Sequence, residues 1–179
     1  MAPFYTMLAI WVGCVILNAI LKADQNTIEL AGATGTQKFF GRYLIFFLLS
    51  QVQTLIIIVG DLVIMGVDCV HPGLFLLAGF FTSLTCSMLA YSFAVAFGNI
   101  GKAIFVVIMI MQIAGSGGSY PIELLPGFFQ QAYLFFPFPY AINAMREAIA
   151  GLYQNNYLIY TLQLLLFFAA GPLPAFPQI

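Results

Sequence analysis

Apolar residues fill most of the chain in long runs, and short polar segments separate these runs. A helix needs about 20 apolar residues to cross a bilayer, and 3–21, 43–66, 73–97 and 103–118 meet or approach that length. A fifth run, 157–171, is shorter and is followed by prolines that cannot continue a helix. The pattern predicts an all-α fold: one polytopic transmembrane helical bundle of about five spans.

Composition supports lipid as the solvent of this bundle. The 179 residues are 63% hydrophobic and 6% charged, whereas an average soluble domain is roughly 45–50% apolar and about 25% charged. The few basic residues are scattered and the net charge is −1, so the chain lacks the basic patch of a nucleic-acid-binding protein. Three cysteines and one histidine show no metal-ligand spacing, and we expect neither a metal nor a cofactor.

The segment between the fourth and fifth runs has too many prolines and glycines for a lipid-exposed span, yet it is too apolar for a free loop. Irregular backbone at membrane depth is tolerated only where protein or a cavity surrounds it. We therefore predict a re-entrant helical hairpin over 126–152, on the extracellular side, with half-helices at about 126–136 and 139–152. The residues expected to break the fourth span and shape the hairpin are Gly115, Gly117, Gly118, Pro121, Pro126, Pro137 and Pro139.

Charged residues within or near the apolar segments are candidates for function. Glu123, Arg146 and Glu147 lie in the hairpin region, where we favour a salt bridge from Arg146 to one of the two acids over substrate chemistry. Asp61 falls inside the second run, and an acid at membrane depth is a functional-site hypothesis by default. A proton or cation relay and an interfacial or paired acid both remain open for Asp61, and we favour the second.

The basic residues also predict an orientation. Lys22, Lys38, Arg42 and Lys102 fall in the first and third connections, which the positive-inside rule places in the cytoplasm. The N-terminus and Glu123 are then outside and the C-terminus is cytoplasmic. The connection 23–41 is either a short interfacial helix or a solvated loop, with Lys38 and Arg42 at a cytoplasmic elbow.

Two glycine-containing motifs resemble catalytic signatures. The stretch around Ser116, AGSGG, is similar to a nucleophile elbow, but alanine replaces its first glycine and no strand precedes it. The turn FGNIGK lacks the first glycine and the Ser or Thr of a phosphate-binding loop. We predict that the chain is not an enzyme and that any ATPase is a separate chain.

A longer string carries a family resemblance. QIAGSGGSYPIELLPGFFQQAYLFFPFPYAINAMREAIAGLY, with the upstream AFGNIGKAIFVVIMIMQ and the opening APFYTMLAIWVG, resembles the C-terminal membrane domain of the YhgE/Pip (phage infection protein) family. That family belongs to the ABC-2 type permease-like superfamily. The resemblance covers most of the chain.

The resemblance implies a multi-pass protein of a bacterial inner membrane that acts as an exporter-like permease subunit. It also implies a homodimer whose outer hairpins form a gate, and a cytoplasmic surface at 22–42 for an ATPase. Family members carry a further span and a large extracellular region before this domain, so we expect this chain to be a fragment, a truncated member or one piece of a split system. The alternative function is a non-transporting membrane anchor or a phage-receptor-type surface protein.

Overall fold

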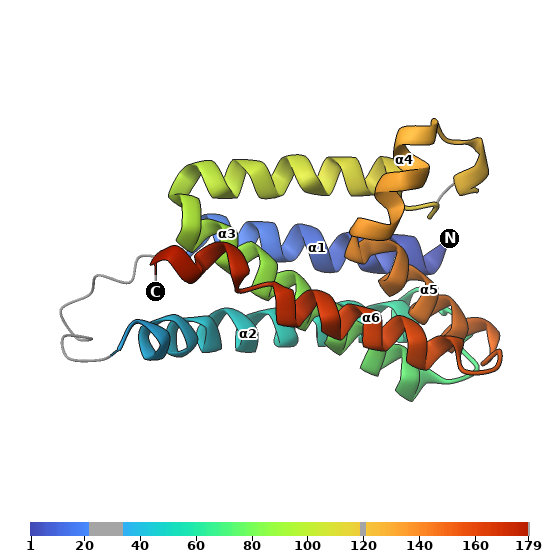
Figure 1. Ribbon diagram of the computed structural model, residues 1–179. Helices are drawn as coiled ribbons and strands as arrows, with labels where there is room; N and C mark the ends of the chain where they lie inside the picture. The colour runs from blue at the N-terminus through green and yellow to red at the C-terminus, as the bar shows by residue number, and fades with distance from the viewer. Residues whose placement is uncertain (22–33, 119–120, 179) are drawn as a thin grey trace.

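The computed structural model describes residues 1–21, 34–118 and 121–178, and these residues form helices and turns without a strand (Figure 1). The helical elements are α1 (Ala2–Ile20), α2 (Gly35–Val59) with a π-helical continuation (Gly60–Ile64), α3 (Pro72–Gly115), a 3₁₀ turn (Ile122–Leu124), α4 (Gly127–Ala132), a second 3₁₀ turn (Tyr133–Phe135), α5 (Pro137–Ala150), α6 (Asn156–Ala170) and a terminal 3₁₀ helix (Leu173–Gln178). The predicted all-α fold is confirmed.

α3 reverses direction in its middle. Its 44 residues would span roughly 66 Å if straight, about twice the hydrocarbon thickness of a bilayer. At Gly98 the backbone turns with φ 57° and ψ −130°, a conformation that L side chains rarely adopt. Gly101 completes the turn, because a β-carbon there would overlap the carbonyl oxygen of Phe93. Two antiparallel arms result, 72–97 and 99–115, and Figure 1 shows the ribbon doubling back.

The first arm of α3 is tied to three neighbouring helices by hydrogen bonds. Such bonds between membrane helices are worth about 0.6 kcal/mol each on average. In this protein, Asn18 Nδ2 of α1 donates to the Ala90 carbonyl oxygen (2.8 Å), and Ser83 Oγ donates to the Ser50 carbonyl oxygen of α2 (3.1 Å). Thr85 Oγ1 donates to the Leu164 carbonyl oxygen of α6 (3.1 Å). Polar side chains inside this apolar bundle therefore connect helices.

Aromatic rings join α1, the second arm of α3 and α5 at the centre of the bundle. The ring of Trp11 stacks on Phe105 with centroids 4.9 Å apart and an interplanar angle of 8°. It meets Phe138 edge to face at 5.1 Å. All three side chains are buried, so α5 lies in the core rather than against it.

Much of the outer surface is apolar. Among the residues that the structure describes, four helices are long and apolar enough to cross a membrane: Ala2–Ile20, Gly35–Ile64, Pro72–Gly115 and Asn156–Ala175. α2 exposes large aliphatic side chains along most of its length, as expected of a helix facing lipid. The helices cover all five predicted runs, although the number of crossings stays a prediction.

The connection before the second run differs from both expectations. Residues 22–33 lie outside the described part of the chain. From Gly35 onward the backbone already belongs to α2, so neither an interfacial helix nor a loop occupies 35–41. Lys38 and Arg42 lie in the first turns of α2. The physical reason is a capping box, in which the Gln37 side chain accepts the Thr34 N–H (3.1 Å) and starts the helix early.

The reversal of α3 predicts a sharp difference between two glycines. Gly101→Ala should destabilise the protein by about 1–3 kcal/mol, because the new methyl group meets backbone that cannot move away. Gly41→Ala in α2 is the matched control, since its β-carbon meets nothing within 4 Å. Unfolding in mixed micelles, followed by circular dichroism, measures both. Equal stability of the two variants would contradict the tight turn.

Candidate functional site

The segment after α3 enters and leaves the bundle at one end. In Figure 1 the second arm of α3 arrives at the right, α4 and α5 follow there, and α6 starts from the same end near the N-terminus. The chain turns between the second 3₁₀ turn and α5 at Phe136, so α5 begins at Pro137 and includes Pro139 in its first turn. The short α4 and the second 3₁₀ turn thus precede the longer α5, and the re-entrant hairpin over 126–152 stays a prediction.

The N-terminus of α5 needs few hydrogen-bond acceptors. Pro137 and Pro139 have no N–H group, and both are buried. The intervening Phe138 N–H donates to Gln112 Oε1 of α3 at 3.3 Å. A side chain from the neighbouring helix thus supplies the cap that the sequence of α5 lacks.

The C-terminus of α5 is capped by the loop before α3. The N–H groups of Val70 and His71 donate to the carbonyls of Ile149 (3.2 Å) and Ala148 (3.0 Å). Cys69 Sγ also donates to the Ala148 carbonyl at 3.3 Å, and burial raises the pKa of this thiol. The loop therefore fixes the second half of the hairpin.

Arg146 connects α5 to the glycine break, the glycine-rich stretch 115–118 at the end of α3. One guanidinium nitrogen donates to the carbonyls of Gly117 (3.3 Å) and Gly118 (3.1 Å), and the other to Asn143 Oδ1 (3.3 Å). Within the described residues Arg146 forms no ion pair with Glu123 or Glu147, so the expected salt bridge is wrong. The reason is geometric: the turn that follows α3 lies beside α5, and the carbonyls of Gly117 and Gly118 in this turn accept from the cation.

The glycine break is a packed joint. A β-carbon at Gly115 would lie 2.7 Å from the ring of Phe129 in α4, and one at Gly118 would overlap the ring of Phe4 in α1. Gly117 has φ 63°. The Gly118 N–H donates to the buried Ser116 Oγ at 3.3 Å, so this hydroxyl forms part of the turn. The sequence indicated the break but gave no signal for the two phenylalanines that fill it.

The acids occupy separate positions. Glu147 Oε2 accepts the Tyr153 N–H (2.7 Å) just beyond α5, and the exposed Glu123 lies in the 3₁₀ turn between Pro121 and Pro126. Asp61 is half-buried in the π-helical continuation of α2, where Thr6 Oγ1 of α1 donates to Asp61 Oδ2 (2.5 Å). Among the described residues, no three side chains of the His, Cys, Asp and Glu type gather where they could hold a metal ion.

Comparison with known proteins decides what kind of membrane protein this is. The model of the ABC-2 family transporter protein matches residues 1–171. The chain belongs to the ABC-2 transporter family. It is also 28% identical over 153 residues to a protein of Bacillus subtilis (strain 168) described as the uncharacterized protein YhgE. The matched part is 84% of this chain and 19% of that relative, so the chain spans about a fifth of the relative's length. No solved structure matches.

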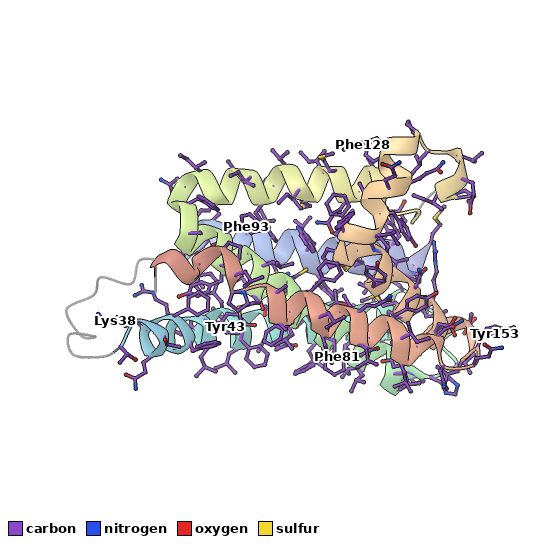
Figure 2. All side chains as sticks on the ribbon, viewed as in Figure 1. Lys38, Tyr43, Phe81, Phe93, Phe128 and Tyr153 are labelled. Carbon is purple, nitrogen blue, oxygen red and sulfur yellow. The ribbon has the colours of Figure 1, made fainter. Side chains whose placement is uncertain are left out.

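The membership confirms the predicted family and makes the chain an integral membrane, permease-like protein of the ABC-2 type. The two ends of the helical bundle carry different features. Lys38 and Arg42 lie at one end, and the hairpin with its break lies at the other, as the labels of Lys38, Phe128 and Tyr153 show in Figure 2. The segment 126–152, which we predict to be a hairpin, therefore lies at the end of the bundle opposite Lys38.

The contacts of Arg146 predict how the hairpin is held. Arg146→Met should lower the free energy of unfolding by about 0.5–1 kcal/mol, because the carbonyls of Gly117 and Gly118, just beyond the end of α3, lose their cationic donor. Hydrogen exchange at residues 115–118 should rise with it. Arg146→Lys, which keeps the charge, should lose less. A Met variant as stable and as protected as the parent would show that this contact does not hold the hairpin.

Proposed function

We propose that this chain is the membrane subunit of an ATP-driven exporter. The observation that carries the proposal is the match of the ABC-2 transporter model to residues 1–171, nearly the whole chain. FGNIGK, the turn most similar to a phosphate-binding loop, forms the helix reversal at Gly98 and Gly101. The energy for transport then comes from a separate ATPase, as is typical of ABC-2 permeases.

We place the protein in the bacterial inner membrane with its N-terminus outside and its C-terminus in the cytoplasm. Lys38, Arg42 and Lys102 support this orientation, because cytoplasmic connections carry an excess of basic residues. In Figure 1 the start of α2, the reversal of α3 and the C-terminus share one end of the bundle. The hairpin then faces outward and serves as the outer gate.

A permease path needs more helices than this bundle supplies, so we propose that it pairs with a second copy or with a further family-type half. The length of the YhgE relative, about five times the matched part, supports the second form. The chain itself performs no covalent chemistry in this proposal. Ser116 supports that view, since its hydroxyl accepts the Gly118 N–H and shapes the turn.

Coupling to an ATPase is the direct test. A partner ATPase should co-purify with the protein from its native host, and its ATP hydrolysis in proteoliposomes should depend on the membrane subunit. Lys38→Glu should weaken the pairing several-fold, because it reverses a charge at the proposed cytoplasmic end. Glu123→Lys is the matched reversal at the other end and should leave the pairing intact. The opposite outcome for these two variants would reject the proposed ATPase surface.

The orientation has its own test in cysteine labelling. In a Cys69→Ser background, Glu123→Cys should react with a membrane-impermeant maleimide added to intact cells, while Lys38→Cys should react only after the membrane is opened. Both side chains are at least partly exposed in the structure. The reverse pattern would invert the orientation.

A further inference from the structure

Two buried hydrogen-bond donors lie beside the N-terminus of α5. Trp11 Nε1 and Gln112 Nε2 have no partner among the residues that the structure describes, and both side chains are 0% exposed. An unpaired buried donor costs about 1–3 kcal/mol. Two such donors in one region indicate an acceptor that binds there.

Phe138 connects the two donors. Its ring meets the Trp11 ring at 5.1 Å, and its N–H donates to Gln112 Oε1 at 3.3 Å. The same N–H belongs to the first turn of α5, a helix of 14 residues whose N-terminus carries a partial positive charge. An electronegative atom in this region gains from the donors and from the helix together.

The direction of the Gln112 amide is set by this contact. If its oxygen and nitrogen were exchanged, Nε2 would face the Phe138 N–H and two donors would oppose each other. Oε1 must therefore lie toward α5, which commits Nε2 to another acceptor. Gln112 Nε2 therefore lacks a partner because Gln112 Oε1 caps α5.

The residues around Phe138 favour a ligand that has an uncharged oxygen and is otherwise apolar. Arg146, the cation of α5, lies eight residues beyond Phe138, about 12 Å along the axis, and already bonds the Gly117 and Gly118 carbonyls. It does not neutralise an anion at Phe138, and an unpaired anion at this depth is costly. The neighbouring core side chains are apolar, among them Met7 and Ile142.

We propose that Trp11 and Gln112, at the N-terminus of α5, bind a neutral carbonyl or hydroxyl oxygen of an amphipathic molecule. The assignment of that molecule as cargo rests on the proposed exporter function. The binding itself does not, because the donors, their burial and the position of Phe138 belong to this chain alone.

Trp11 is the single tryptophan, so its indole gives one N–H resonance in the ¹⁵N-labelled protein. We would titrate the full chain in dodecyl maltoside micelles with methyl decanoate, and with undecane as a hydrocarbon of equal carbon count. The ester should move the indole resonance downfield in a saturable way, and undecane should not. Gln112→Leu should weaken ester binding about fivefold, the equivalent of one neutral hydrogen bond.

Each other outcome overturns the proposal. Equal responses to ester and alkane would show an apolar pocket without acceptor recognition. An indole N–H that exchanges with water and ignores the ester would show a hydration site. If Gln112→Leu fails to fold, the wild-type comparison of the two probes still decides. Because the titration contains no ATPase, its failure leaves the exporter proposal standing, and loss of ATPase coupling leaves the binding site standing.

Discussion

The bundle depends on the pairing of backbone polar groups where water cannot reach them. α5 shows this constraint most clearly, because it is buried among the other helices and has two ends that need partners. Pro137 and Pro139 remove donors at its start, Gln112 accepts the remaining one, and the loop before α3 satisfies carbonyls at its end. A helix can begin and end inside the bundle only because two other segments, α3 and the loop before it, meet its ends.

The same constraint explains the glycine break. The chain leaves α3 beside α5, and Arg146 donates to the carbonyls of Gly117 and Gly118, just beyond the end of α3. Phe129 and Phe4 fill the space that the glycines leave, which lets α4 and α1 approach the break closely. A stretch that looks like a catalytic turn in the sequence is thus a joint between four helices. Its hydroxyl, from Ser116, belongs to the turn.

Local signals were sufficient for most of the fold. Apolar runs located α1, both arms of α3 and α6 to within a few residues, because backbone and hydrophobic constraints act over short distances in sequence. The hairpin expected from the prolines stays a prediction. The reversal at Gly98 was predicted as the short turn between two runs. The start of α2 was missed, since Thr34 and Gln37 form a capping box whose strength relative to a loop could not be judged from composition.

The candidate site was less predictable because its contacts join distant residues. Arg146 was expected to pair with an acid, since charge is the visible feature of the hairpin sequence. A carbonyl at the end of a helix is an equally good partner for a cation, but only the fold shows which helix ends beside Arg146. The partners of Gln112 likewise could not be predicted from the sequence. A glutamine in a membrane span commonly bonds to a neighbouring helix. Only the position of Phe138 shows that Gln112 Oε1 accepts its N–H while Nε2 has no partner among the described residues.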